Sequence, residues 1–222
     1  MKKPDLAIFD LDNTILNGDS DYSMINYLID MNILDEKAKD KNDKFISDYQ
    51  NGILDFGSYT QFALAAYIGK SIDEINQIIF PFVEKIVESM INVFALKLLH
   101  QHFDNSDDIL LASATNELIV KPIAKRLAIK NVVATKVKFV NKKCSGDFIP
   151  PFALGKGKLD LVRIWMKENN YYDFSGVTFY SDSINDLPLL ELVEFPKVVN
   201  PDEQLKTIAT ERRWEIIILP TI

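Results

Sequence analysis

Short runs of apolar residues recur along the chain, and most of the gaps between them have the spacing of amphipathic helices. The runs lie at residues 6–9, 109–112, 132–135, 177–180, 197–200 and 215–219. Residues 117–128, 157–168 and 202–211 place apolar side chains three and four positions apart, with charged residues opposite. Strands that are buried on both faces and alternate with helices predict an α/β fold, in which helices cover both faces of a parallel sheet.

Residues 16–91 depart from this pattern, because they contain few strand-like runs. Their helical stretches lie at 22–33, 56–68 and 72–91. We predict a helical insertion, the term used below for residues 16–91, between the first strand and the rest of the sheet. The predicted division is a core domain of residues 1–15 and 92–222 and a small helical domain of residues 16–91.

Charge is distributed unevenly between these two parts. The chain of 222 residues has a formal net charge of −7, and residues 16–90, with 13 acidic and 6 basic residues, account for all of it. This balance argues against nucleic acid as a partner. No apolar run approaches the ~18 residues of a membrane span, and the single cysteine, Cys144, excludes an internal disulfide. We expect a cytoplasmic protein without a membrane partner, either a monomer or a homodimer.

Pairs of acids follow two of the predicted strands. Asp10 and Asp12 come directly after the first strand, and Asp182 and Asp186 follow the strand predicted at 177–180. Such acids can simply begin turns or helices, because Asp favours those positions. The carboxyl ends of parallel strands meet at one edge of a sheet, however, and several carboxylates gathered there form an all-oxygen site suited to Mg²⁺.

A serine and two lysines stand at comparable places. Ser113 comes just past the strand predicted at 109–112, where it either adds a hydroxyl to the same edge or caps the helix that begins near Asn116. Lys156 and Lys158 begin another predicted helix, either as a solvated surface pair or as a source of positive charge for the acids.

The order of these residues resembles the haloacid dehalogenase superfamily of phosphohydrolases. Asp10, Asp12 and Thr14 match its first motif, Ser113 its second, Lys158 its third, and Asp182 and Asp186 its fourth. The helical insertion lies between the first two motifs, where the C1 class of the superfamily has a helical cap. The amino-acid sequence in and around the motifs resembles that of the phosphoserine-phosphatase-like branch, subfamily IB. This resemblance covers residues 4–200 and implies a Rossmann-like core.

The resemblance implies an Mg²⁺-dependent phosphatase that hydrolyses a small phosphomonoester. Asp10 is the implied nucleophile, which forms an aspartyl-phosphate, and Asp12 the implied general acid and base. Lys158 is implied to offset the repulsion between carboxylate and phosphate, with Lys156 as an alternative two positions earlier. The implied metal ligands are Asp10, Asp182 and Asp12, the last through its backbone carbonyl.

Further residues are implied around the phosphate by the same resemblance. Thr14, Ser113 and Ala114 are implied to bind phosphate oxygens or to hold the motif backbone. Asp186 and Asn185 are implied to orient the waters of the metal or the lysine. The implied partner is a small phosphorylated metabolite. A phosphomutase that uses the same acid pair, and a receiver-like domain in which a phosphorylated aspartate is a switch without turnover, remain alternatives.

The helical insertion departs from phosphoserine phosphatase at two positions. Where that enzyme has a Glu for the substrate amine, seven residues after the general acid, this chain has Asp19. If Phe56 matches the Phe of that enzyme's cap, Ala63 stands in place of the Arg that binds the substrate carboxylate, and residues 16–90 contain no Arg. We therefore expect Asp19 to bind substrate and phosphoserine to be disfavoured. Asp19 and Asp21 suit a neutral or amine-bearing leaving group, with histidinol phosphate as one example, although the acidic charge of the insertion can also simply provide solubility.

Three further patterns favour structural interpretations. His100 and His102 are two positions apart, without the four-residue spacing of zinc ligands on a helix, so we expect surface histidines. Five aromatic residues of the insertion either line a pocket over the metal or, as their helical spacing favours, belong to the core: Tyr49, Phe56, Tyr59, Phe62 and Tyr67. The alternating residues 136–153 contain a Gly and a Pro-Pro, which predicts a hairpin as a second small insertion.

Overall fold

Seven strands form one sheet in the order β4-β3-β2-β1-β5-β6-β7, in a computed structural model that describes residues 4–50 and 53–220. The strands are β1 (Leu6–Phe9), β2 (Asp108–Asn116), β3 (Asn131–Val140), β4 (Lys143–Ile149), β5 (Val177–Ser181), β6 (Phe195–Val199) and β7 (Glu215–Ile217). All neighbouring strands are parallel except β3 and β4. The predicted α/β fold with a parallel sheet is confirmed.

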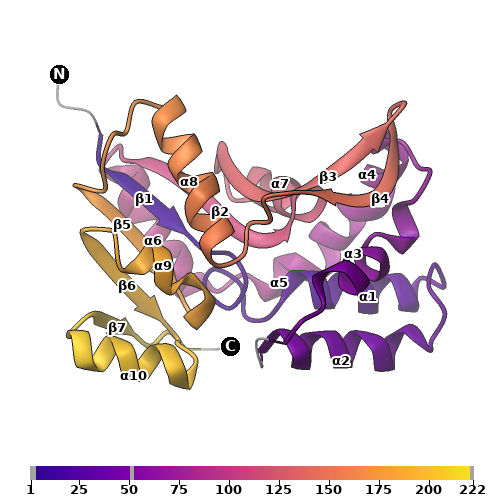
Figure 1. Cartoon of the computed structure of the whole chain (residues 1–222), viewed down its shortest axis with the longest axis horizontal. Helices are drawn as coiled ribbons and strands as arrows, with labels where there is room; N and C mark the ends of the chain where they lie inside the picture. Colours follow the sequence, from indigo (N-terminus) through magenta and orange to yellow (C-terminus); the bar gives the residue numbers. More distant parts are fainter. Residues whose placement is uncertain (1–3, 51–52, 221–222) are drawn as a thin grey trace.

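Helices lie on both faces of the sheet and in the helical insertion (Figure 1). The insertion contains α1 (Ser20–Asp30), α2 (Ala38–Gln50), α3 (Phe56–Ala63), the 3-10 turn η1 (Ala65–Tyr67), α4 (Ile72–Phe82), the π turn η2 (Val83–Val87) and α5 (Glu88–Met90). The remaining helices are α6 (Val93–Asp104), α7 (Glu117–Arg126), α8 (Lys156–Glu168), the 3-10 turn η3 (Ile184–Asp186), α9 (Leu187–Leu190) and α10 (Glu203–Arg212). Within the described ranges, no helix has the length and apolar character that crossing a membrane requires.

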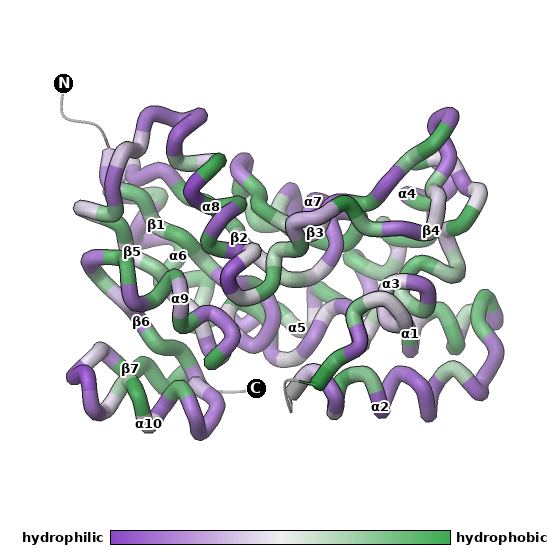
Figure 2. Tube along the Cα trace, viewed as in Figure 1, coloured by the Kyte–Doolittle hydropathy of each residue, from purple (hydrophilic) through white to green (hydrophobic). Residues whose placement is uncertain are grey.

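The central strand β1 sends side chains into two separate hydrophobic cores, because successive residues of a strand point to opposite faces. Ala7 and Phe9 belong to a core that also contains residues of α6, α7 and the helical insertion. Leu6 and Ile8 belong to a core formed with α8, α9 and α10. Figure 2 shows the contrast between hydrophobic β1 and the largely hydrophilic outer helix α2. The insertion therefore shares a core with one face of the sheet.

Both connections to the helical insertion run side by side. Leu16 and Ile91 form an isolated antiparallel bridge, the Asn17 amide donates to the Met90 carbonyl at 2.7 Å, and the Asn92 amide donates to the Ile15 carbonyl at 2.9 Å. The chain therefore leaves the core and returns to it through two adjacent, hydrogen-bonded segments. This arrangement supports our proposal that residues 16–91 are a separate helical domain.

Two of the predicted elements differ from those in the structure. The stretch predicted at 72–91 is helical from Ile72 to Met90 but not uniformly α-helical: α4 contains Pro81, which has no N–H to donate, and the π turn η2 follows it directly. The predicted hairpin is not a separate insertion, because its first strand is the continuation of β3. Its second strand, β4, contacts the helical insertion, where Cys144 exchanges backbone hydrogen bonds of 2.9 Å with Gly69 and Lys70.

The start of α8 requires glycine at two positions. Gly155 precedes the helix with φ +55°, a conformation in which a side chain is strained. Gly157, the second residue of α8, packs so closely that a Cβ would lie 2.1 Å from the Phe152 carbonyl oxygen. The first turn of α8 therefore packs directly against the preceding loop, and this packing fixes the position of Lys158.

We predict that Gly157→Ala lowers the free energy of unfolding by about 1–3 kcal/mol, because the backbone must shift to admit the methyl group. Gly57→Ala is the matched control: it is also the second residue of a helix, and its Cβ would meet only the Asp55 carboxylate, at 3.5 Å. We expect this control to be neutral or slightly stabilising. Equal losses in the two variants, measured by urea unfolding, would contradict the prediction.

Candidate active site

The register of the sheet brings two acid clusters to the same edge. β1 and β5 are parallel neighbours, with Phe9 opposite Tyr180, so the chain leaves both strands at the same level. Asp10 directly follows β1 and its amide still bonds the Tyr180 carbonyl at 2.9 Å. Asp182 directly follows β5. The carboxyl edge of the sheet therefore gathers these acids from distant parts of the sequence, as expected for an open parallel sheet.

Lys158 lies between two of these acids. Its ammonium is 3.0 Å from Oδ1 of Asp10 and 2.7 Å from Oδ2 of Asp186, and its side chain is 3% exposed. Ser181 Oγ donates to the same Asp186 oxygen at 2.7 Å. Lys156, the alternative from the sequence, is exposed on the first turn of α8. Of the two lysines, only Lys158 reaches the acids.

Burial and charge act in opposite directions on these groups. Burial by itself would lower the pKa of Lys158, but the carboxylates of Asp10 and Asp186 raise it well above its ordinary value, so the ammonium stays charged. Burial raises the pKa of Asp10 to about 7, although Lys158 lowers it. Burial, and then the charges of Asp10 and Asp186, raise the pKa of Asp182. The cluster therefore has more carboxyl groups than one lysine can pair, and without a further cation burial and repulsion favour the neutral forms of Asp10 and Asp182.

Asp12 is held by donors from two other segments. The Ser20 amide donates to its Oδ1 at 2.7 Å, and Thr115 Oγ1 donates to its Oδ2 at 2.8 Å. Ser113 Oγ lies 3.5 Å from the same Oδ2. Burial, followed by repulsion from Asp19, raises the pKa of Asp12 to about 6. This carboxyl can therefore exchange a proton near neutral pH.

The other predicted phosphate-binding residues lie around the same edge. Thr14 Oγ1 donates to Oδ1 of Asp182 at 3.3 Å, which joins the first motif to the fourth. Ala114 lines the cavity described below, and its carbonyl accepts from Thr135 Oγ1 at 2.8 Å. Ser113 lies within β2 and does not cap the following helix; Asn116 does, accepting from the Leu118 amide.

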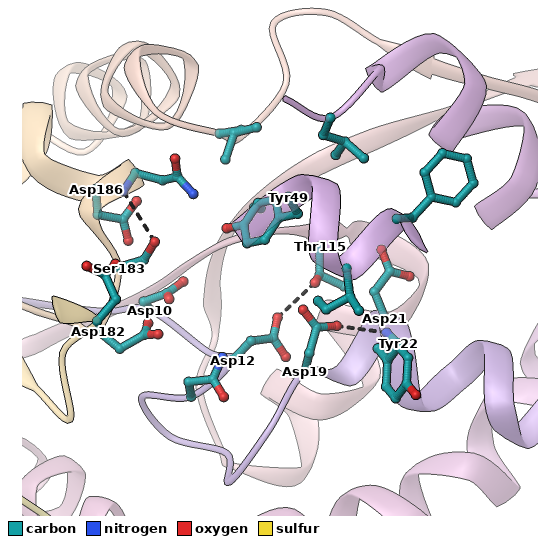
Figure 3. Close-up of a pocket in the computed structure, with 18 of the residues that line it drawn as sticks. Asp10, Asp12, Asp19, Asp21, Tyr22, Tyr49, Thr115, Asp182, Ser183 and Asp186 are labelled. Atoms are coloured by element: carbon teal, nitrogen blue, oxygen red, sulfur yellow. Dashed lines mark hydrogen bonds between the residues drawn. The ribbon is translucent and has the colours of Figure 1, made fainter. Parts of the chain in front are cut away.

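A cavity of about 320 Å³ connects these acids to the helical insertion. We call one end the lysine end, formed by Asp10, Lys158, Asp182 and Asp186, and the other the aromatic end, formed by Asp19, Asp21, Phe45, Phe56 and Tyr59. Figure 3 shows the labelled acids in two groups, with Tyr49 between them. A ligand that fills the cavity would contact both the sheet edge and the insertion.

The carboxylates of Asp19 and Asp21, at the aromatic end, accept hydrogen bonds from different donors. Asp19 caps α1 by accepting from the Tyr22 amide at 2.7 Å. Asp21 accepts hydrogen bonds from the Tyr59 hydroxyl and, at 3.4 Å, from Asn116 Nδ2. Burial raises the pKa of both acids to about 6.

Aromatic side chains form much of the wall at this end. The core position favoured for all five aromatic residues of the insertion is correct for Phe62 and Tyr67. Tyr49, Phe56 and Tyr59 line the cavity instead, although Phe56 and Tyr59 also pack against the edge of the core. Helical spacing does not distinguish these cases, because an inward-facing aromatic ring can contact either a core or a cavity between two parts of the fold.

Positive charge in the cavity is confined to one end. Among the described residues that line it, Lys158 is the single basic side chain. Ala63, where phosphoserine phosphatase would have its arginine, is buried in the hydrophobic core. The aromatic end therefore has acids and no cation that could bind a carboxylate of the substrate.

The acids at the lysine end are suited to a divalent cation by their chemistry. They offer oxygen donors only, and Lys158 pairs with Asp10 and Asp186 but not with Asp182, whose pKa burial and the neighbouring acids raise in the absence of a further cation. No group of three His, Cys, Asp or Glu side chains in the described ranges is arranged to hold a metal. The ligand set expected for Mg²⁺ needs only the carboxylates of Asp10 and Asp182, since Asp12 enters through its backbone carbonyl and its side chain is bonded elsewhere.

Thr115 and Asp202, which lie near the acids, were not predicted from the sequence as residues of the site. Thr115, which bonds Asp12, is two positions after Ser113, and this period of two along β2 is the signal that could have revealed it. Asp202 caps α10 and also accepts from the Ile184 amide at 2.6 Å, so it supports the loop that carries Asp182. It comes three residues after the end of β6, a third instance of an acid in the segment that follows a strand.

The expectation of surface histidines is correct for His100, which is exposed, but wrong for His102. His102 is 14% exposed and is bonded through Nδ1 to Asp107 at 2.8 Å and through Nε2 to the Tyr180 hydroxyl at 2.9 Å. Tyr180 also stacks on Phe9, with ring centroids 4.4 Å apart. His102 is therefore a structural residue that supports the ends of β1 and β5 from the other face.

A parallel sheet with acids and a lysine at its carboxyl edge, facing a helical insertion across a cavity, defines a hydrolase of the haloacid dehalogenase type. The model of the haloacid dehalogenase-like hydrolase family matches residues 7–191, and the chain belongs to this family. A histidinol-phosphatase of Neisseria meningitidis serogroup C (strain 8013) is 35% identical over 216 residues, which cover 96% of this chain and 97% of that protein.

Solved structures resemble the chain as a whole. A protein of unknown function from Bordetella pertussis Tohama I has a TM-score of 0.88 and 28% identity, covering 97% of this chain and 99% of that one. A phospho-aspartyl intermediate analogue of phosphoserine phosphatase has a TM-score of 0.70 and 15% identity, covering 98% and 94%, and shows the shared fold. Three predictions are confirmed: membership of the family, similarity to its phosphoserine-phosphatase-like branch, and phosphatase activity.

We predict that Lys158→Met, in metal-free buffer, lowers the free energy of unfolding by about 3–5 kcal/mol at pH 8, because buried carboxylates lose their partner. The loss should be smaller at pH 5. Lys158 lowers the pKa of Asp10, so its removal raises that pKa beyond about 7, and the acid is neutral in the variant at pH 5.

Lys156→Met is the matched control for this experiment, since it removes the same charge from the same helix turn at an exposed position. Its effect should stay within ~0.5 kcal/mol at both pH values. Urea unfolding followed by circular dichroism measures both variants. A loss in Lys158→Met that is equal at pH 5 and pH 8 would count against the predicted ion pairs.

Proposed function

We propose that this phosphatase is Mg²⁺-dependent and hydrolyses a small phosphomonoester through an aspartyl-phosphate formed on Asp10. One observation carries this proposal: the Asp10 carboxylate lies in the cavity with one oxygen on the buried ammonium of Lys158 and with Asp182 beside it. A nucleophilic carboxylate needs positive charge close to it before a phosphate dianion can approach. The lysine end meets that requirement.

The chain's own residues account for both displacements. Lys158 bonds Oδ1 of Asp10, and we assign Oδ2 as the atom that attacks phosphorus while the bond to the leaving oxygen breaks. Asp12 gives its proton to that leaving oxygen and then takes a proton from the water that attacks phosphorus in the second step. Phosphate departs with the water's oxygen, and the Asp10 carboxylate is restored. The pKa of Asp12, raised to about 6, suits both roles.

The carboxylates of Asp10 and Asp182 and the backbone carbonyl of Asp12 would hold Mg²⁺. When bound there, the ion supplies positive charge to the phosphoryl oxygens. Thr14 orients the Asp182 carboxylate by its hydrogen bond, and Asp186 orients Lys158 by its ion pair. We place Asn185, which lines the cavity beside them, in the same supporting group.

The aromatic end favours a leaving group that has an amine and no carboxylate. Asp19 and Asp21 offer negative charge there, and among the described lining residues the sole cation is at the other end. We propose histidinol phosphate as the substrate, with Asp19 as the acid that meets its amine. The name of the Neisseria relative, which is similar over nearly the whole chain, supports the same choice. Phosphoserine, which adds a carboxylate, is disfavoured.

We predict that Asp10→Asn lowers the rate of phosphate release by about a thousandfold or more, because an amide does not attack phosphorus. Wild-type protein quenched in acid during turnover should retain phosphorus label from the substrate, and the variant should retain none. The unfolding midpoint checks that the variant is folded. Chelation of Mg²⁺ in the wild type should stop the same reaction. Full activity of Asp10→Asn would refute the proposed intermediate, and substrate loss without phosphate release would favour a phosphomutase.

We predict that Asp19→Asn lowers kcat/KM for histidinol phosphate by about tenfold to hundredfold, because it removes the charge that faces the amine. Turnover of p-nitrophenyl phosphate, which has no amine, should change less than threefold. Asp55→Asn is the matched control: Asp55 caps α3 as Asp19 caps α1, and Asn serves equally well as a cap. An equal loss with both substrates would contradict the role of Asp19 in recognising the amine.

A further inference from the structure

Tyr49 brings the helical insertion into contact with the lysine end. It belongs to the last turn of α2 and lines the same cavity as Asp10, Lys158 and Asn185. In Figure 3 its ring lies between the two groups of acids, and its hydroxyl is directed toward the side of Asp186 and Ser183. Tyr59, which also lines the cavity from the insertion, instead donates its hydroxyl hydrogen bond to Asp21 at the aromatic end.

The interactions of the Tyr49 hydroxyl are those of the catalytic cluster. Burial raises the pKa of Tyr49 above its ordinary value, so the phenol keeps its proton and can donate a hydrogen bond. Lys158, Asp186, Asp10 and Asn185 also affect the pKa of Tyr49, which places its hydroxyl within electrostatic reach of these side chains. A neutral donor therefore lines the cavity close to the carboxylate of Asp10.

A phosphoryl group in transfer has three non-bridging oxygens, and each is stabilised by a donor or a cation. Lys158 and the proposed Mg²⁺ site supply charge from the core, which leaves the side facing the insertion. We propose that the Tyr49 hydroxyl donates a hydrogen bond to a non-bridging phosphoryl oxygen during transfer to and from Asp10. This inference rests on the proposed function. It makes Tyr49 a catalytic residue supplied by the insertion.

This role differs from recognition of the leaving group. The phosphoryl oxygens are common to every phosphomonoester, so a residue that contacts them affects all substrates alike and acts mainly on kcat. A residue that contacts the leaving group changes the preference between substrates. Asp19, at the aromatic end, represents the second kind in the same cavity.

The test compares Tyr49→Phe with the wild type on histidinol phosphate and on p-nitrophenyl phosphate, in Mg²⁺ buffer. We expect kcat to fall about tenfold to hundredfold on both substrates, with KM changed less than threefold, because one charge-assisted hydrogen bond is lost. Tyr172→Phe is the control: its hydroxyl bonds Asn170 on the surface, and its side chain is 84% exposed.

Tyr49→Leu separates the hydroxyl from the ring. We expect it to lose at least as much kcat as Tyr49→Phe, with unfolding midpoints confirming that both variants are folded. Unchanged kcat in Tyr49→Phe would overturn the inference, even if Tyr49→Leu were impaired, because the ring alone would then matter. A loss confined to one substrate would also overturn it. Neither result touches the proposed function, which the Asp10→Asn variant tests separately.

Discussion

The structure of this protein depends on several buried carboxylates that meet at one sheet edge with a single lysine among them. Like charges in a poorly solvated site repel one another, so the edge is stable only when cations offset them. Lys158 is that offset within the chain, and the surrounding loop is built to hold it: Gly157 allows α8 to press against Phe152, and Ser181 shares the Asp186 oxygen that bonds the ammonium. The carboxyl group that Lys158 does not pair, on Asp182, is a ligand for the proposed divalent cation, and that cation would in turn offset the charge of a phosphoryl group.

The cavity divides recognition and chemistry between the two parts of the fold, but not completely. The core supplies the carboxylates and the lysine, and the helical insertion supplies the aromatic walls and the acids Asp19 and Asp21. Tyr49 is the exception, because it belongs to α2 of the insertion but interacts with the lysine end of the cavity. The insertion also shares a continuous hydrophobic core with one face of the sheet, and β4 is tied to it by backbone hydrogen bonds at Cys144. The part of the cavity proposed to select the substrate and the part proposed to transfer the phosphoryl group are therefore joined by direct packing of the insertion against the sheet.

Much of the fold was predictable because its signals are local. Fully apolar strand runs and helical spacing identified the sheet, and each acid at a strand end identified a candidate for the site. The errors arose where local patterns have more than one tertiary outcome. His102 has an unremarkable neighbourhood in sequence, yet it is enclosed between Asp107 and Tyr180. Thr115 was passed over because β2 continues beyond residues 109–112, through Ser113 to Asn116.

The sequence by itself determined the fold class, the order of the motifs and the chemical type of the site, because these follow from hydrophobic periodicity and from residue identities at strand ends. The tertiary structure decided which lysine reaches the acids, which aromatic rings line a cavity, and where the insertion meets the core. These questions depend on distances between segments far apart in the chain, such as the 3.0 Å between Lys158 and Asp10. Local patterns do not encode such distances, since they are set only when the sheet register and the helix packing are complete.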